Sequence, residues 1–313
     1  MAGTGARSVY GLKTETGWRL GFDGPPPARI APYLPQPGRY GRWIDKLGLA
    51  PALAGFSAIS AAVIFVALQV PAWIAPHVPL AWENRLGDAM VRDLDRQYCH
   101  TPAGDAALRA LAAKMGAGVA VRSVEVADFP LVNAITLPGG RIIIFDGLLQ
   151  QAQSADEVAG VLGHEMGHVE HRDTLKAMIR QMGLKVVMGG FDGKVGNYVN
   201  GVLNLSYSRS AESEADQASV VSLKRANINP SDTAAFFTRL GGGKDTQQAE
   251  MAMNWAASHP VSNERRRVFA ASQIAGHAYA PAITGPQWES LKYMCEDDPK
   301  RAERIRQADQ YGD

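Results

Sequence analysis

The stretch VLGHEMGHVEHRD, residues 161–173, decides how the rest of the chain is interpreted. Histidines four residues apart on a helix lie one above the other on the same face, so the imidazoles of His164 and His168 can converge on one metal ion. Glu165 follows the first histidine, where a carboxylate can take a proton from a metal-bound water without being a ligand. Three fixed positions recur by chance in a chain of this composition with a probability of about 1%. A third ligand at a suitable distance therefore has to support the metal site.

That ligand is expected on a second helix, within YSRSAESEAD at residues 207–216. Glu212 and Asp216 are four residues apart and share a helix face, whereas Glu214 is rotated by about 200° from Glu212. His171 would lie a turn beyond the metal. Two histidines and a glutamate form the three-ligand zinc site that hydrolytic enzymes use, with one open position. Asp216 is then suited to hold a ligand imidazole by its other nitrogen.

An uncharged run of nineteen residues at 52–70, ALAGFSAISAAVIFVALQV, is long enough to cross a membrane as a helix. A buried core helix is the alternative, but it rarely has so long a run without charge. Some fifty residues precede the run, so an uncleaved signal anchor fits better than a cleaved signal peptide. We expect one transmembrane helix at 51–76.

Basic residues indicate the orientation of this helix. Seven basic residues precede it against three acidic ones, whereas Glu83 and Arg85 beyond it cancel. The positive-inside rule then predicts a single-pass protein of the inner (cytoplasmic) membrane, with a cytoplasmic N-terminus and a periplasmic catalytic domain.

The rest of the chain divides by composition. Residues 1–50 form a Pro-rich cytoplasmic segment that should be extended or only lightly folded. Residues 77–296 are expected to be the metallopeptidase domain, and residues 297–313 a charged tail. A strand-rich stretch ends in VNAITL and RIIIF around Pro138-Gly139-Gly140, which predicts a hairpin. Nearly everything after it has helical spacing, and the Gly-rich segment 182–205 is expected to be a packed or membrane-facing helix pair.

Charge and cysteine content narrow the possible functions. Lysine and arginine total 32 against 31 acidic residues, a net charge of +1 that gives no field to attract nucleic acid. The two cysteines, Cys99 and Cys295, are too few for a zinc ribbon. In the oxidising compartment that the topology predicts, we expect them to form a disulfide; two buried free thiols are the alternative.

Four motifs in order resemble one known family, the gluzincins that include the CAAX prenyl endopeptidases, the heat-shock membrane protease HtpX, the mitochondrial Oma protease and periplasmic quality-control proteases. The motifs are NAITLPGGRIIIFDGLL, VLGHEMGHVEHRD, YSRSAESEAD and SHPVSNERR. The resemblance covers about residues 82–267 and is closest to single-span or periplasmic bacterial members. It implies an α+β, mainly helical zincin-like domain with a small sheet, and a zinc endopeptidase with one Zn²⁺ per chain.

The resemblance also implies site residues. The ligands would be His164, His168 and Glu212, with Glu165 as the base. His259 would lie near the metal, where it could hydrogen-bond a developing oxyanion or occupy the open zinc position.

Two further pairs are candidates for supporting roles. Arg209 and Tyr207 precede the helix of the third ligand and could orient it, and the strand through Asn133 and Ile135 could pair with an extended polypeptide substrate. Envelope proteins that are misfolded or misassembled are the substrates that the resemblance suggests. A protease-like chaperone or adaptor with a plugged zinc site is the rival function, and a metal-free scaffold is a third.

Overall fold

The computed structural model describes residues 8–11, 14–34, 42–91, 94, 97–116, 121–183, 205, 207–241, 259, 263–301 and 303. The chain divides into two compact units, Met1–Ala67 and Leu68–Asp313. The metal-binding motif lies in the second unit. The predicted helix pair at 182–205 and most of the charged tail fall outside the described residues.

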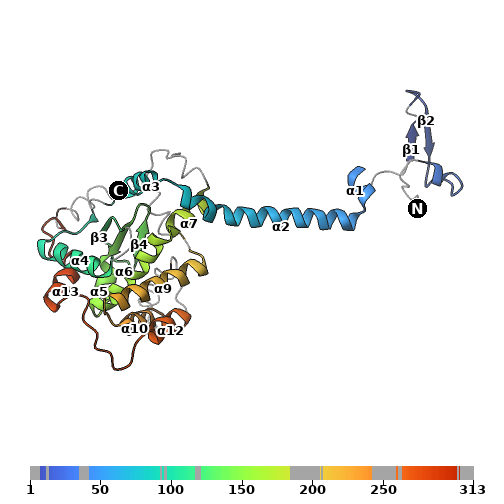
Figure 1. Cartoon of the computed structure of the whole chain (residues 1–313). Helices are drawn as coiled ribbons and strands as arrows, with labels where there is room; N and C mark the ends of the chain where they lie inside the picture. The colour runs from blue at the N-terminus through green and yellow to red at the C-terminus, as the bar shows by residue number, and fades with distance from the viewer. Residues whose placement is uncertain are drawn as a thin grey trace, which may run out of the picture. The chain divides into compact units, whose positions relative to one another are not determined.

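The first unit holds a small antiparallel sheet and short helices (Figure 1). Its elements are β1 (Ser8–Gly11), β2 (Arg19–Phe22), the 3-10 helix η1 (Ala31–Tyr33), α1 (Arg42–Leu47) and the start of α2 (Leu49–Ile74). The sequence predicted an extended or only lightly folded segment here, and the described part of it contains this strand pair and the short helices. Tyr10 and Phe22 are diagonal neighbours on one face of the pair, with ring centroids 6.1 Å apart. The prolines follow the hairpin, so they do not interrupt its ladder.

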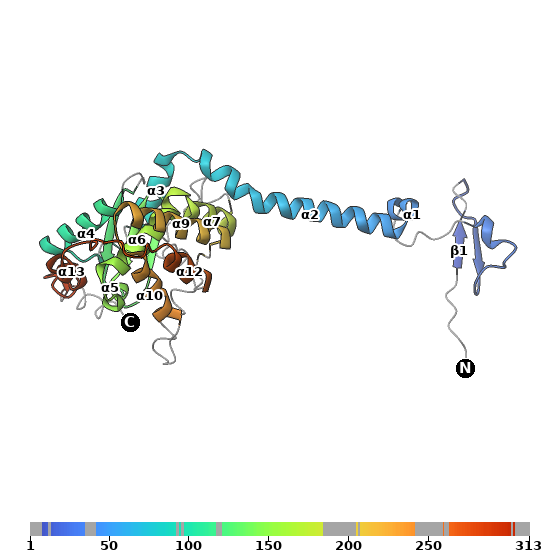
Figure 2. The ribbon, with the colours of Figure 1, turned by 60° about the horizontal axis from the view of Figure 1, so that its bottom comes forward.

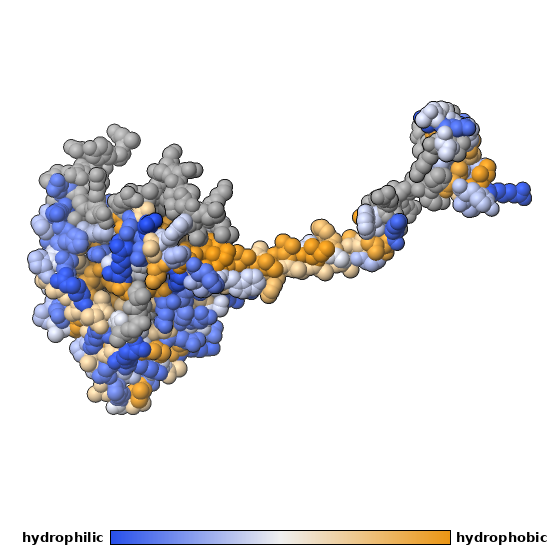
Figure 3. Space-filling model, turned by 45° about the horizontal axis from the view of Figure 1, so that its top comes forward, coloured by the Kyte–Doolittle hydropathy of each residue, from blue (hydrophilic) through white to orange (hydrophobic). Residues whose placement is uncertain are grey.

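Helix α2 carries the uncharged run, and hydrophobic side chains cover its visible face (Figure 3). In the part of the chain that the structure describes, one helix could cross a membrane by length and composition. It is Leu49–His77, which includes the 3-10 helix η2 (Ala75–His77) and contains an 18-residue window with a mean hydropathy of 2.1. The span predicted at 51–76 falls within it.

A three-stranded sheet organises the second unit. Its order is β3 (Ser123–Ala127), β5 (Arg141–Phe145), β4 (Ala134–Leu137), with β3 parallel and β4 antiparallel to β5. The predicted hairpin is confirmed. Gly139 and Gly140 have φ angles of 79° and 75°, which residues with a Cβ rarely adopt, and they allow the tight turn between β4 and β5.

Helices pack on both faces of this sheet, and β5 contributes to two hydrophobic cores. Ile142 and Ile144 belong to one core, whereas Ile143 and Phe145 belong to the other. Both faces are covered, so the strand is apolar throughout rather than alternating. The predicted class, α+β and mainly helical with a small sheet, is confirmed.

The helices lie around the sheet in Figure 2, and their buried residues divide between the two cores. The core with Ile143 contains residues from α3 (Leu80–Val91) and α7 (Asp173–Met182). The other contains residues from α4 (Pro102–Met115), α5 (Asp146–Gln151), α6 (Ala155–Glu170), α9 (Arg209–Arg225), α10 (Pro230–Gly241), α12 (Asn263–Ala271) and α13 (Gly285–Lys292). The motif helix α6 therefore lies in the interior, between the sheet and α9.

Glycines allow α6 and α9 to approach closely. A Cβ at Gly163 would lie 3.1 Å from the backbone of Ser219, and one at Gly167 would lie 2.7 Å from Cα of Ala215. The contact at Gly167 is shorter than Cβ atoms tolerate, so α9 would have to move away, whereas at Gly163 the backbone of Ser219 would have to shift by a few tenths of an ångström. This approach brings the start of α9 next to the motif histidines.

A disulfide joins Cys99, ahead of α4, to Cys295, after α13, with Cα atoms 4.8 Å apart. The helices α4 and α13 pack against each other, so the bridge connects two segments that are already in contact. On the chain-entropy account, closing a loop this long could contribute up to about 5 kcal/mol of stability.

We predict that the protein isolated from its native compartment has no free thiol. Alkylation without prior reduction, followed by mass spectrometry, should leave both cysteines unmodified. Alkylation after reduction should label both cysteines. Opening the disulfide should also lower the midpoint temperature of thermal unfolding. Two labelled thiols before reduction would contradict the predicted pairing, and a Cys99→Ser/Cys295→Ser variant serves as the control that reduction leaves unchanged.

Candidate metal centre

Four buried side chains with metal-ligating atoms converge in the second unit. His164 and His168 come from α6, Glu212 from the first turn of α9, and His259 precedes α12. One ligating atom from each lies within 4.8 Å of all the others. The three histidines and the glutamate are at most 6% exposed.

The distances within this cluster match a tetrahedral zinc site. Nε2 of His168 lies 3.1 Å from Nε2 of His164. Oε2 of Glu212 lies 3.6 Å from Nε2 of His164, and Oε1 lies 3.4 Å from Nε2 of His168. Nδ1 of His259 lies 3.1 Å from both Nε2 of His164 and Oε1 of Glu212. With zinc–nitrogen bonds of 2.0–2.1 Å, the edge of the coordination tetrahedron is about 3.3 Å. The donor set and its spacing therefore fit zinc.

Carboxylates hold the outer nitrogens of both motif histidines. Oδ1 of Asp216 lies 2.9 Å from Nδ1 of His164, and Oδ2 of Asp173 lies 3.0 Å from Nδ1 of His168. A histidine fixed at Nδ1 presents Nε2 to the metal in one orientation and one tautomer. Both Nε2 atoms consequently face the same point.

Asp173 reaches its position through an unusual turn. Arg172 has φ 53°, in the left-handed region that residues with a Cβ rarely adopt, and it ends one helix and begins the next. Its side chain donates to Glu83 and to the backbone oxygen of Val78 at 2.8 Å. These contacts stabilise the turn that places Asp173 beneath His168.

Arg265 of α12 supplies the positive charge next to the acidic ligand. Its guanidinium donates to Oδ1 of Asp216 at 2.7 Å and to Oε2 of Glu212 at 3.2 Å. Burial opposes the charged form of Glu212, but His259 and His168 outweigh it and hold the pKa of this carboxyl far below its usual range. The carboxylate is therefore ionised and available as a ligand at neutral pH.

The pKa values of the two motif histidines are shifted in opposite directions in the metal-free protein. Burial and the nearby charge of Arg265 lower the pKa of His164 to about 4. Burial also opposes protonation of His168, but hydrogen bonds with Asp173 and Glu212 outweigh it and raise its pKa to about 9. At pH 7 the pair therefore carries one proton more than two neutral imidazoles.

We predict that zinc binding at pH 7 releases about one proton, because Nε2 of His168 must be deprotonated before it can bind a metal. Zinc affinity should rise about tenfold per pH unit from pH 7 towards 8.5. Titration calorimetry in two buffers with different ionisation heats measures the proton count. Release of no proton, or of two, would contradict the protonation states assigned to this pair.

Glu165 lies beside the cluster on the side of the sheet. Thr136 of β4 donates a hydrogen bond to Oε2 of Glu165 at 2.8 Å, and Oε1 lies 3.4 Å from Nε2 of His259. The carboxylate is fully buried. It is thus held next to the metal position without being one of the four clustered donors.

Tyr207 connects the metal ligands with the strand that holds Glu165. Its ring stacks on His168, with centroids 4.1 Å apart and planes at 16°. Its hydroxyl lies 3.1 Å from Oγ1 of Thr174, which itself donates to the backbone oxygen of Thr136 at 2.9 Å. Since Thr174 has one hydroxyl proton, Tyr207 donates to Thr174.

The other residues considered as a third ligand or as a support for it lie away from the four clustered donors. Glu214 is exposed on the other side of α9, and His171 caps the C-terminal end of α6. Arg209 is exposed at the first position of α9, and the guanidinium that contacts Glu212 belongs to Arg265 instead.

Three residues that contact side chains of the metal centre were not predicted from the sequence: Asp173, Thr136 and Arg265. Each lies within one of the four motifs, but no spacing rule indicates its contact with the centre.

A zincin-like fold with an HExxH helix and a glutamate on a following helix defines the gluzincin class of metallopeptidases. A family model described as Peptidase family M48 matches residues 105–272. The chain belongs to this family, which confirms the resemblance found in its motifs.

Curated relatives agree with this assignment. The Arabidopsis thaliana mitochondrial metalloendopeptidase OMA1 is 30% identical over 164 residues, which cover 50% of this chain and 32% of the relative. The Escherichia coli metalloprotease LoiP is 32% identical over 145 residues, covering 43% and 56%. A Vibrio cholerae protein named as a beta-barrel assembly-enhancing protease is 26% identical over 176 residues, covering 47% and 35%. The matches thus span from about a third to just over half of these relatives.

Proposed function

We propose that this chain is a membrane-anchored zinc endopeptidase that cleaves misfolded or misassembled polypeptides of the bacterial envelope. The observation that supports it most is the buried set of His164, His168, Glu212 and His259 at tetrahedral spacing beside Glu165. Family membership implies polypeptide substrates. The relative named for beta-barrel assembly motivates the choice of envelope proteins.

The reaction divides between the metal and the side chains around it. Zinc, when bound, would polarise the scissile carbonyl and lower the pKa of a bound water. Glu165, fixed by Thr136, accepts the proton of the attacking water and returns it to the leaving amine. His259, whose Nε2 lies 3.4 Å from Oε1 of Glu165, would donate a hydrogen bond to the developing oxyanion.

The outer edge of β4 is the proposed binding site for an extended substrate. The N–H of Phe145 donates to the oxygen of Asn133 at 3.0 Å, which sets the alternation of the antiparallel pair. The backbone groups of Ile135 then point towards β5, and those of Ala134 and Thr136 point outwards. A substrate strand would pair with the latter two, next to Glu165.

Side chains cover part of this edge in the absence of substrate. Oδ1 of Asn133 accepts the N–H of Ala134 at 2.9 Å, and Thr174 donates to the oxygen of Thr136 at 2.9 Å. A substrate backbone offers an acceptor for the N–H of Ala134 and a donor for the oxygen of Thr136, so the backbone of the strand edge stays hydrogen-bonded when it displaces the two side chains.

One observation favours the rival function, a protease-like chaperone or adaptor. Nδ1 of His259 is placed as a fourth donor, 3.1 Å from both His164 and Glu212, and could fill the position that a substrate carbonyl needs. A protease in this conformation would have to release His259 before cleavage.

The location that we propose is supported by α2. Its apolar run and the basic residues that precede it support a single span with the N-terminus in the cytoplasm. The disulfide supports an oxidising compartment, the periplasm, for the catalytic domain.

Incubation of the purified full chain with zinc and casein tests the proposal. We expect cleavage at internal peptide bonds, loss of cleavage with a chelator, and recovery when zinc is restored. A protein that carries one zinc per chain and cleaves neither casein nor denatured envelope proteins would favour the chaperone. In that case His259→Ala should restore cleavage if the histidine is what blocks the metal.

A further inference from the structure

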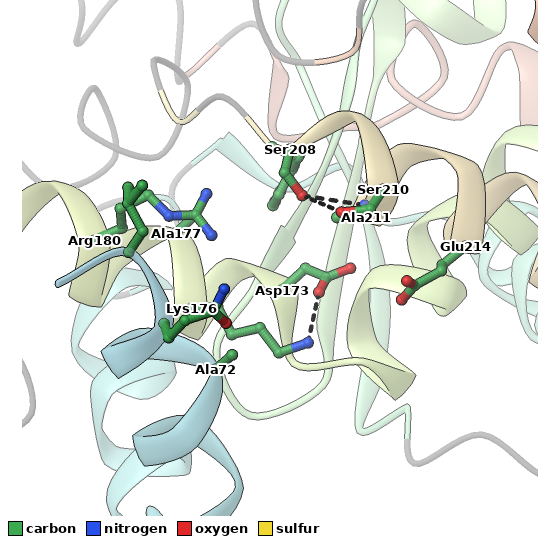
Figure 4. A pocket seen from close by; sticks show the side chains of 12 residues that line it. Ala72, Asp173, Lys176, Ala177, Arg180, Ser208, Ser210, Ala211 and Glu214 are labelled. Atoms are coloured by element: carbon green, nitrogen blue, oxygen red, sulfur yellow. Dashed lines mark hydrogen bonds and ion pairs between the residues drawn. The ribbon is translucent and has the colours of Figure 1, made fainter. Parts of the chain in front are cut away.

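A cavity of about 320 Å³ lies in the second unit between the last turns of α2, helix α7 and the start of α9 (Figure 4). We propose that it binds the zwitterionic headgroup of a membrane phospholipid, with the phosphate diester at Arg180 and Lys176 and a primary ammonium at Glu214. The inference rests on the proposed membrane anchor.

The position of the cavity along α2 places it at the membrane surface. A helix needs about 20 residues to cross a hydrocarbon core of about 30 Å. Counted from Ala52, where the uncharged run begins, that length ends at Pro71. Leu68 and Gln69 line the cavity, and Gln69 carries the first amide side chain of the helix. The cavity therefore begins where the hydrocarbon ends and headgroups start.

Charged side chains from two helices surround the space. Lys176 and Arg180 lie one turn apart on α7, and in Figure 4 the guanidinium of Arg180 is turned towards the cavity. Lys176 donates to Oδ1 of Asp173 at 3.0 Å, so its charge is largely neutralised, but an ammonium has two further donors. Glu214 lines the cavity from α9.

The balance of charge decides which headgroup fits. With Lys176 and Asp173 paired, the described residues that line the cavity present one cation, Arg180, and one anion, Glu214. An anionic headgroup would face Glu214 with like charge, and a lone cation would face Arg180. A phosphate joined to a primary ammonium satisfies both, and the guanidinium can bind the phosphate through two N–H groups.

The cavity also shares a wall with the metal centre. Asp173 and Tyr207 line it, and the same two residues contact His168 by a hydrogen bond and by stacking. A headgroup bound here would keep α7 against the membrane surface and thus orient the catalytic side of the domain.

The test uses the full chain reconstituted into vesicles with equal amounts of phosphatidylethanolamine and phosphatidylglycerol. Native mass spectrometry of the gently extracted protein counts the lipids that remain bound. We expect one phosphatidylethanolamine, retained at least about fivefold over phosphatidylglycerol. Arg180→Gln should lose this retention, whereas Arg267→Gln, an equal charge change at an exposed site on α12, should keep it. Glu214→Gln should shift the preference towards phosphatidylglycerol.

Each other outcome overturns the assignment. Equal retention of the two lipids, or a preference for phosphatidylglycerol, would contradict a zwitterionic site, and unchanged retention in Arg180→Gln would place the lipid elsewhere. Flotation and carbonate extraction of the same vesicles report on the anchor separately. A chain that does not integrate fails there and overturns both proposals, whereas an integrated chain without bound lipid overturns the headgroup site alone.

Discussion

Replacing Glu165 by glutamine is expected to lower peptide hydrolysis by about 10²- to 10⁴-fold while zinc content stays unchanged. Glutamine has the same shape, and its carbonyl oxygen can accept the hydrogen bond that Thr136 donates. It cannot take a proton from water. Because Glu165 is not among the four clustered donors, the metal should remain bound.

Cleavage of a fluorogenic peptide and atomic absorption on the same samples measure both quantities. Glu170→Gln is the matched control, since Glu170 lies at the exposed end of the same helix. It should behave as the wild type. Activity retained in Glu165→Gln would show that another group activates the water.

The second large effect is expected at the proposed third ligand. Glu212→Ala should lose zinc and activity together, because its carboxylate lies within 3.6 Å of Nε2 of both His164 and His168. Glu214→Ala should retain both, since that side chain is exposed on the other side of α9. Asp216→Asn should weaken zinc binding by about 10- to 100-fold, because Asp216 orients His164.

Removal of Glu212 also leaves Arg265 with one carboxylate fewer, so Glu212→Ala could lose zinc through misfolding. Glu212→Gln preserves the shape of the side chain and separates the two causes. A folded Glu212→Gln protein with weakened zinc binding supports the ligand role. A metal-free Glu214→Ala protein alongside a loaded Glu212→Ala protein would show that α9 faces the metal with its other side.

The sequence predicts those parts of the site whose geometry depends on a single helix. The spacing of His164 and His168 depends only on a regular helix, and so does the shared face of Glu212 and Asp216. The hairpin followed from glycines that a tight turn requires. For these features, the relation between sequence and geometry is local.

The contacts that complete the centre are not local. Asp173 follows a left-handed residue, so the spacing of α6 no longer applies to it. Thr136 reaches Glu165 across the packing of β4 on α6, 29 positions away, and Arg265 reaches Asp216 across 49. Contacts between residues this far apart in the sequence depend on how whole helices and strands pack. They cannot be predicted from the pattern of one segment.

The close approach of α6 and α9 has a consequence for how the protein can change over generations. Gly163 and Gly167 bear no reactive group, yet a single methyl at either position would press against the backbone of the helix that carries Glu212. The spacing between the two halves of the ligand set is thus limited by residues that never touch the metal. Substitutions elsewhere on α6 remain open to selection. At these two positions, selection should retain glycine, because any side chain would disturb the position of the helix that carries Glu212.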